Sequence, residues 1–140
     1  MVEPRISLVT LGVADVARSR QFYEALGWPG TGGEGGSPVF IQAGGLILAL
    51  WGRGDLAEDS AASDSGGWGG ITLAHNVRSS REVDAVTEEA RSVGAEILRE
   101  PAATFWGGYN ALWADPDGHR WEIAHNPAWE LRSDGSIVLN

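Results

Sequence analysis

The order of apolar and polar segments in the first half of this chain is repeated in the second half. An apolar, β-branched run opens each half, at residues 6–13 and 71–77. Each run leads to a residue type that caps helices, Asp15 or Ser79, and then to apolar residues at helical spacing. Helices in this order would cover one face of a sheet and leave the other face free to build a cleft.

Both helices carry signals for their ends. The first is expected to run from the Asp15 cap to about Leu26, with Gly27 at the position where a glycine often ends a helix. The second has a capping-box pair, Ser79 and Glu82, and is expected to end at Gly94. The apolar stripes that identify the two helices are Val16, Phe22, Tyr23 and Leu26 in the first, and Val83, Val86, Ala90 and Val93 in the second.

Strands are expected after each helix. In the first half a Gly44-Gly45 turn joins segments 39–43 and 46–51, and in the second half the segments are 96–99, 109–114 and 120–125. Thr10-Leu11-Gly12 and Thr72-Leu73-Ala74 are matched as equivalent positions just before the two helices. Between the halves, residues 53–67 are rich in Asp, Ser, Ala and Gly, which predicts a flexible surface linker. An edge strand is expected at residues 136–139.

The stretch from Asp115 to Ile123 bears most directly on function. Pro116 and Gly118 predict a tight turn, and the strand after it places Glu122 on the face opposite Trp121 and Ile123. A carboxylate on an otherwise apolar strand needs a partner, because an unpaired buried charge is costly. That partner is a metal ion, a ligand cation or an arginine such as Arg120 or Arg99.

Bulk composition narrows the function classes. The 140 residues suffice for one domain with a sizeable core, and a net charge of −9 argues against a nucleic-acid or anionic-membrane partner. With no cysteine there is no disulfide, thiolate nucleophile or zinc–thiolate site. No signal peptide or membrane-spanning run is apparent at the sequence level, so a cytoplasmic protein is expected. Seven tryptophans supply material for a core, a dimer interface or a stacking pocket.

The chain repeats a β-α-β-β-β order, carries Thr10-Leu11-Gly12-Val13-Ala14-Asp15 in one half and has the Asp115–Glu122 stretch near its end. In these features it resembles the vicinal-oxygen-chelate superfamily. This superfamily includes glyoxalase I, bleomycin-resistance proteins and extradiol dioxygenases, and the resemblance covers roughly residues 5–126. It implies an α+β fold in which two βαβββ modules form a curved mixed sheet around a cleft. The expected division of one glyoxalase-like domain, 1–140, is a first module at 5–52, a linker at 53–67, a second module at 68–126 and a C-terminal extension at 127–140. Dimers are usual in this fold, so a homodimer is expected.

The resemblance also implies where a divalent metal would bind. Metal-dependent members take ligands from the first and last strands of each module, and Glu122 matches the ligand of the final strand. The other three positions are assigned to Leu8, Ala49 and Gly70, which offer no side-chain donor, whereas a divalent ion needs about three protein ligands. His75, His119 and His125 are interpreted as surface or hydrogen-bonded residues. The expectation is therefore no metal or other cofactor, with a divalent metal left open only if Glu122 joins ligands that the pattern does not reveal.

Strand alternation predicts a mostly apolar cleft with aromatic walls and a few polar anchors. Trp106 and Tyr109 are placed in a glycine-containing loop that would close over a ligand. Trp113, Trp121 and Phe22 are expected between sheet and helix, while Trp51 and Trp106 are open to a second interpretation as core or dimer-interface residues. The candidate ligand-binding residues are Thr10, Ile47, Trp51, Thr72, Trp106, Tyr109, Asn110, Leu112 and Glu122.

Three functions fit these features. The first is metal-independent binding of a small aromatic or cationic molecule, as in bleomycin-resistance proteins, which fits the negative charge and the tryptophans. The second is a metal-dependent lyase, isomerase or dioxygenase that uses Glu122 as a ligand, or a metal-free enzyme that uses it as a base. The third is a partner-binding module whose cleft is filled.

Overall fold

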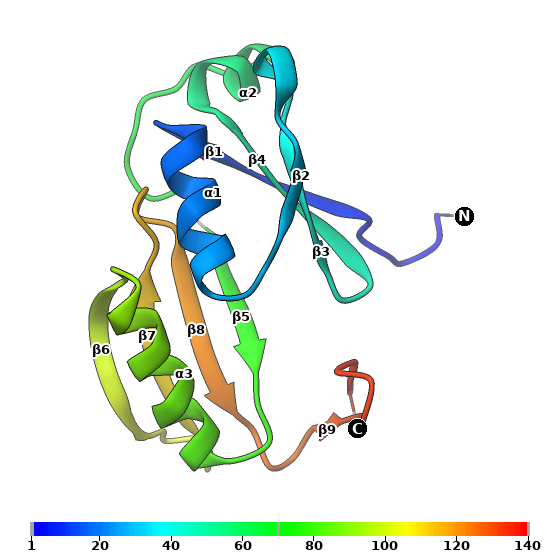
Figure 1. The fold of residues 1–140 in the computed structure, drawn as a ribbon. Coiled ribbons are helices and arrows are strands. Elements are labelled where there is room, and N and C mark those ends of the chain that lie inside the picture. Colours follow the sequence, from blue (N-terminus) through cyan, green and yellow to red (C-terminus); the bar gives the residue numbers. More distant parts are fainter. Residues whose placement is uncertain (1, 70, 140) are drawn as a thin grey trace. The chain divides into compact units, whose positions relative to one another are not determined.

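The computed structural model describes residues 2–69 and 71–139 (Figure 1). The chain divides into two compact units, Met1–Gly67 and Trp68–Asn140. Each unit contains a four-stranded mixed sheet and the helix order expected from the repeat. The α+β fold built from two βαβββ modules is thereby confirmed. Within the described residues, no helix is long and apolar enough to cross a membrane.

The first unit has one parallel and two antiparallel strand pairs. Its sheet order is β1-β4-β3-β2, in which β1 runs parallel to β4. The elements are β1 (Leu8–Val13), α1 (Val16–Ala25), β2 (Gly30–Gly32), the 3-10 helix η1 (Glu34–Gly36), β3 (Val39–Ala43), β4 (Leu46–Gly52) and α2 (Arg53–Asp59).

Helix α1 begins and ends where its capping residues predict. The Asp15 carboxylate accepts a hydrogen bond from the Arg18 N–H at 3.1 Å, which satisfies a donor that the helix itself leaves open. At the other end Gly27 has a φ of +90°, the left-handed conformation that glycine adopts without steric cost. The buried residues of α1 include Phe22 and Tyr23, whose rings meet edge to face at 5.1 Å.

The core of this unit lies on the side of the sheet where the alternating side chains are buried. The buried residues of the strands are Leu11, Val13, Val39, Ile41, Leu48 and Leu50, together with Ala49 from the alternate set. The opposite alternation carries Thr10, Ile47 and Trp51, which are half-buried. Those positions match the side of β1 and β4 that the sequence assigned to the cleft.

The segment expected to be a flexible linker is helical over its first half. Helix α2 packs near the end of β1, where a Cβ added to Gly12 would lie 3.3 Å from side-chain atoms of both Arg53 and Leu56. Arg53 also makes a two-pronged ion pair with Asp64, at 2.8 and 2.6 Å. Composition indicated a flexible surface linker here, but it could not reveal an ion pair between residues eleven positions apart.

The second unit repeats the topology of the first. Its sheet order is β5-β8-β7-β6, and β5 runs parallel to β8, as β1 does to β4 in the first unit. Figure 1 shows α3 lying along one face of this sheet. The elements are β5 (Thr72–Asn76), α3 (Ser80–Ser92), β6 (Glu96–Ala103), β7 (Tyr109–Ala114) and β8 (Arg120–His125).

The expected capping residues of α3 are present, with one change of partner. The Ser79 hydroxyl accepts from the Glu82 N–H at 3.1 Å, as a capping box requires. The Glu82 carboxylate, however, accepts from the Arg78 N–H at 2.7 Å, one residue before the cap. Both contacts fix how the chain passes from β5 into α3.

Tryptophan packing defines the face of the second sheet that α3 covers. Trp113 and Trp121 are 3% and 6% exposed, and their rings stack at a centroid distance of 5.7 Å. Val83 of α3 is fully buried. The expectation that Trp113, Trp121 and Phe22 are core residues is therefore confirmed.

The structure shifts the equivalence between the two modules by two residues. Asp15 and Ser79 both cap helices, and counting back five residues from each pairs Thr10 with Ala74 rather than with Thr72. Strand register agrees, since Thr10 lies opposite Ala49 and Ala74 lies opposite Glu122. The residue equivalent to Leu8 is accordingly Thr72, and the earlier candidate, Gly70, lies outside the described residues. The two Thr-Leu dipeptides are therefore not at equivalent positions of the two modules.

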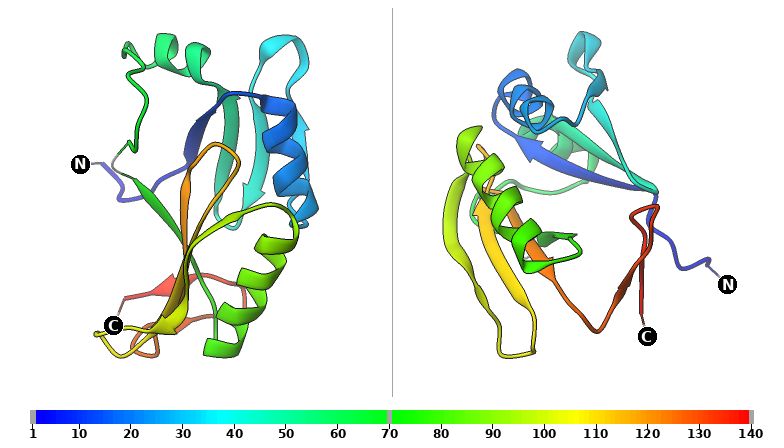
Figure 2. Two further views of the ribbon diagram at one scale, coloured as in Figure 1. Left: turned by 90° about the vertical axis from the view of Figure 1, so that its left-hand side faces the viewer. Right: turned by 60° about the horizontal axis from the view of Figure 1, so that its bottom comes forward.

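Three further differences concern strands. The glycine-rich segment after α1 contains a short strand, β2, that its composition concealed. Strand β6 extends four residues beyond the expected 96–99 and is interrupted by register shifts. The C-terminal extension forms its own two-stranded sheet from β9 (Glu130–Leu131) and β10 (Ile137–Val138), instead of adding an edge strand to a module. Figure 2 shows this hairpin in red beyond the end of β8.

Candidate functional site

Glu122 lies on the face of the second sheet opposite α3. Its cross-strand neighbours are Ala74 on β5 and Leu112 on β7. The turn before β8 is held by the Asp115 carboxylate, which accepts hydrogen bonds from the N–H groups of Asp117 and His119, both at 2.9 Å. This Asp-Pro-Asp-Gly turn is the local reason why Glu122 has a fixed position in the sheet.

The partner of Glu122 is an amide. Asn110 donates from Nδ2 to the Glu122 carboxylate at 2.7 Å, and its Oδ1 accepts from Arg99 at 3.4 Å. The orientation of the amide follows from chemistry, because a carboxylate only accepts and a guanidinium only donates. Asn110 is 7% exposed, so its side chain is held between the two charged groups with little access to water.

Neither arginine considered from the sequence forms an ion pair with Glu122. Arg99 reaches it only through Asn110, and Arg120 donates instead to the Gly118 carbonyl at 2.7 Å. Among the described residues, Asn110 is the one hydrogen-bond partner of the carboxylate. Half-buried Glu122 therefore keeps acceptor capacity on a sheet face that α3 does not cover.

Sequence reasoning had placed Asn110 and Glu122 on one face without recognising the bond between them. The available signal was the diagonal relation: Leu112 lies directly opposite Glu122, and Asn110 is two residues away on the same strand. Diagonal neighbours on one face are within reach of long side chains.

Trp106 lies in the turn between β6 and β7, close to the start of the strand that carries Asn110. Its indole packs so closely over Gly108 that a Cβ there would come within 1.9 Å of the ring. The turn is closed by the Gly108 N–H, which donates to the Thr104 hydroxyl at 2.9 Å. Trp106 is still 40% exposed, so an aromatic surface is presented from an ordered turn.

Tyr109 does not share the face of Asn110 and Glu122, and its expected placement is corrected. Its hydroxyl donates to Asp84 of α3 at 2.7 Å, so the side chain points toward the helix. This hydrogen bond raises the pKa of Tyr109, since the neighbouring carboxylate disfavours the phenolate. Strand β7 begins at Tyr109, as the expected segment 109–114 requires, and strand alternation turns this side chain toward α3 rather than toward a ligand.

The remaining candidates keep the positions expected for them within each module. Thr10, Ile47 and Trp51 lie on the alternation of the first sheet opposite its core, where the Trp51 indole N–H donates to the Gly36 carbonyl at 2.9 Å. In the second sheet Thr72, Asn110, Leu112 and Glu122 share the face opposite α3. A role in ligand binding remains a prediction for all of them.

The donor set around Glu122 does not match that of a metal centre. Across residues 2–69 and 71–139, no group of three or more His, Cys, Asp or Glu side chains is arranged to hold an ion. His75 belongs to the opposite alternation of β5, and His125 faces the Val77 carbonyl through Nδ1 at 3.3 Å. With the corrected equivalence, Thr72 occupies the ligand position first assigned to Gly70, and its hydroxyl would add at most one weak metal ligand.

Comparison with known proteins places this architecture in a family. The family model for the Glyoxalase/Bleomycin resistance protein/Dioxygenase superfamily matches residues 5–123. The chain is similar to a glyoxalase-related enzyme from Fulvimarina pelagi, at 37% identity over 98% of this chain and 99% of that one, with a TM-score of 0.89.

Two other solved structures are similar at lower identity. A glyoxalase/bleomycin resistance protein/dioxygenase from Nocardioides is 26% identical over 89% of this chain and 85% of that one, with a TM-score of 0.74. A hypothetical protein from S. aureus is 25% identical over 90% and 96%, with a TM-score of 0.77. No curated protein matches the chain. The family match over most of the sequence shows that this chain belongs to the glyoxalase/bleomycin resistance protein/dioxygenase superfamily.

Proposed function

We propose that this protein binds a small, positively charged organic molecule on the face of its second sheet that α3 does not cover. Glu122 anchors this ligand, and binding needs no divalent metal. The Glu122 carboxylate is held by Asn110 and has no ion pair among the described residues. This observation carries the proposal, because a fixed carboxylate with open lone pairs is suited to a cationic donor group.

The surroundings of Glu122 support a partly apolar, aromatic ligand. Leu112 lies beside it on the same face, and Trp106 presents its indole near the start of the same strand. An apolar surface with a few fixed polar groups is the usual composition of a small-molecule site, and an indole face attracts cations. The net charge of −9 favours the approach of such ligands.

The proposal is tested by calorimetry with three related probes at neutral pH. Benzylammonium offers a charge and N–H donors, benzyltrimethylammonium offers a charge alone, and benzyl alcohol offers a neutral donor. We expect saturable binding of the two cations and much weaker binding of the alcohol. Glu122→Gln should weaken benzylammonium binding by about tenfold to a hundredfold, the range for a hydrogen bond to a charged group.

Glu96→Gln provides a matched control, because Glu96 is an exposed glutamate on β6 of the same sheet. It removes the same charge and should leave binding unchanged. Equal loss in both variants would assign the effect to net charge and contradict the proposed anchor.

Metal analysis of protein purified without chelator tests the metal-free part. Stoichiometric divalent metal in the wild type, lost in Glu122→Ala, would overturn it and favour the alternative of a metal-dependent lyase, isomerase or dioxygenase. Thermal shifts with Mn, Ni, Fe and Zn ions give an independent readout, and we expect no stabilisation that depends on Glu122.

A further inference from the structure

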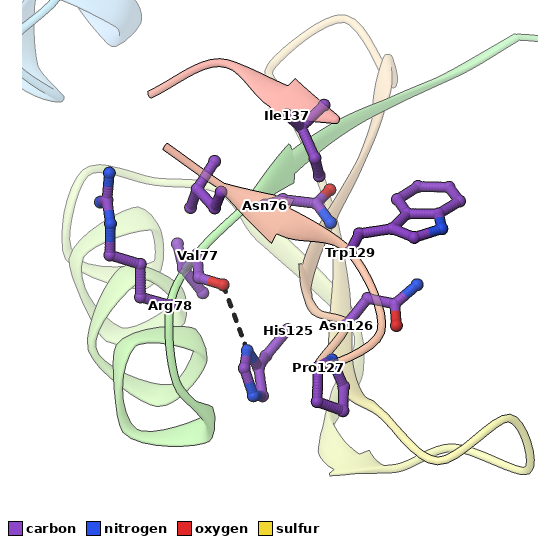
Figure 3. A pocket seen from close by; sticks show the side chains of 9 residues that line it. Asn76, Val77, Arg78, His125, Asn126, Pro127, Trp129 and Ile137 are labelled. Carbon is purple, nitrogen blue, oxygen red and sulfur yellow. Dashed lines mark hydrogen bonds between the residues drawn. The ribbon is translucent and has the colours of Figure 1, made fainter. Parts of the chain in front are cut away.

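A pocket lies in the second unit, between the ends of β5 and β8 and the C-terminal hairpin (Figure 3). Its volume is about 340 Å³, within the range of roughly 300–1,000 Å³ that small-molecule pockets occupy. Glu122 is not among the residues that line it, so this pocket is separate from the site described above. Part of its lining, namely Pro127, Trp129, Leu131 and Ile137, belongs to the C-terminal extension, to which no function was assigned from the sequence pattern.

Hydrogen-bonding groups on one side of the pocket are unoccupied within the described chain. Asn76 makes no side-chain hydrogen bond there, and Asn126 uses only Oδ1, which accepts from the Ala128 N–H at 3.0 Å. The indole N–H of Trp129 is likewise unused by the described residues, and Trp129 is 43% exposed. In Figure 3 these three side chains lie on the same side of the pocket.

Acidic side chains are absent from the described lining of this pocket. None of the described residues lining the pocket is Asp or Glu, although the whole chain carries a net charge of −9. The one arginine of the lining, Arg78, lies on the other side in Figure 3 and donates to the Arg132 carbonyl at 2.6 Å. A ligand beside Asn76 and Trp129 therefore meets no carboxylate, and the ionisable side chains of the described lining are Arg78 and His125.

The chemistry of these groups fits hydroxyls. A carboxamide both donates and accepts, and so does a hydroxyl, so two carboxamides can match a ligand that presents several OH groups. The Trp129 indole and the Ile137 side chain add flat and apolar surface against which C–H groups of a ring can pack. We propose that the pocket beneath the C-terminal hairpin binds a neutral, polyhydroxylated ring such as a monosaccharide or disaccharide.

The test uses the full chain, labelled with ¹⁵N, and follows the indole and carboxamide N–H signals by NMR. The indole signal of Trp129 is assigned from the variant Trp129→Phe. Glucose, galactose, maltose and cellobiose are titrated to tens of millimolar. We expect one or more of them to shift the Trp129 and Asn126 signals saturably, while the indole signal of Trp106 stays in place.

Asn126→Asp is the informative variant, because it keeps the oxygen that accepts from Ala128 and replaces the N–H donors with a negatively charged oxygen that can only accept. We expect about threefold to tenfold weaker sugar binding, the equivalent of one lost hydrogen bond, with the backbone spectrum otherwise unchanged. Trp129→Ala should abolish binding, and Trp68→Phe, at an exposed aromatic residue outside the pocket, should not change it.

Three outcomes would overturn the proposal. One is the absence of any saturable shift with all four sugars. Another is a response of the Trp129 signal to benzoate but to none of the sugars, which would assign the pocket to anions. The third is sugar binding that survives both Trp129→Ala and Asn126→Asp. Loss of the Glu122 site would affect none of these readouts, so the two proposals fail independently.

Discussion

Desolvation lowers the pKa of His75 on β5, while the nearby Glu82 carboxylate opposes the shift only in part. Part of the residue remains open to solvent, yet loss of water around the ring disfavours its charged form. The folded protein therefore binds a proton at this position less readily than the unfolded chain does, whose histidine keeps a pKa near 6.5.

The direction of the stability change follows from linkage. As pH falls below 6.5 the unfolded state takes up the proton first, so the free energy of unfolding decreases. We predict that His75→Gln loses less stability than the wild type between pH 7 and pH 5, as measured by urea denaturation. His119→Gln serves as the control for the other histidines. Parallel curves for His75→Gln and the wild type would contradict the prediction.

Glu122 and Asn110 show what residue-level reasoning can and cannot reach. Alternation placed both side chains on the uncovered face, because the period of a strand is two. Their mutual hydrogen bond depends on the register between β7 and β8, which no local pattern specifies. Tyr109 was grouped with the ligand loop because it follows Gly107 and Gly108, although it also opens the expected strand 109–114, whose alternation turns its side chain toward α3.

At the scale of elements, α2 and the loop after it are fastened by the Arg53–Asp64 ion pair. This contact, with the Gly66 N–H donating to Asp64 at 3.0 Å, lowers the pKa of Asp64 from 3.8 to about 2. The carboxylate form is preferred in the folded state, so the stabilisation is present above pH 4 and is lost as pH falls toward 2.

We predict that Asp64→Asn has less stability than the wild type at pH 5, and that the difference between their urea midpoints shrinks as pH approaches 2. Amide exchange at Gly66 should be faster in the variant at pH 5, because its acceptor has lost the charge. Asp59→Asn, at the last residue of α2, is the control. A midpoint difference that is constant with pH would exclude this ion pair as its origin.

Helices were the most predictable elements because their ends are encoded locally. Asp15 and Ser79 cap α1 and α3 in the way their sequences indicate. Strand β2 was missed because Gly30 and Gly32 carry no strand propensity, and its pairing with β3 comes from the tertiary fold. Helix α2 was missed for a related reason: an acidic, small-residue segment has no apolar stripe.

For the whole molecule, the internal repeat was enough to predict the fold but not to align its two halves. Both modules have the βαβββ order, and each pairs its first strand in parallel with its last. Matching Thr10 to Thr72 nevertheless shifted the second module by two residues, since a two-residue shift preserves strand alternation. Helix caps are the better reference, because each fixes one residue at the junction of strand and helix.

The net charge of −9 supplies a prediction for the molecule as a whole. A cation near an acidic protein is attracted by many charges, and salt screens them over a Debye length that falls from about 30 Å at 0.01 M to about 3 Å at 1 M. We predict that the Kd of benzylammonium rises several-fold between 0.01 and 0.5 M NaCl, whereas that of benzyl alcohol stays nearly constant. Glu122→Gln should show a shallower salt dependence than Glu96→Gln. The half-buried Glu122 carboxylate attracts the bound cation directly and also adds to the long-range electrostatic potential of the protein, whereas Glu96 adds only to that potential. Calorimetric titrations at four salt concentrations measure both slopes. An equal salt dependence for the charged and the neutral probe would mean that salt acts on the protein itself, and the electrostatic basis of the proposed function would fail.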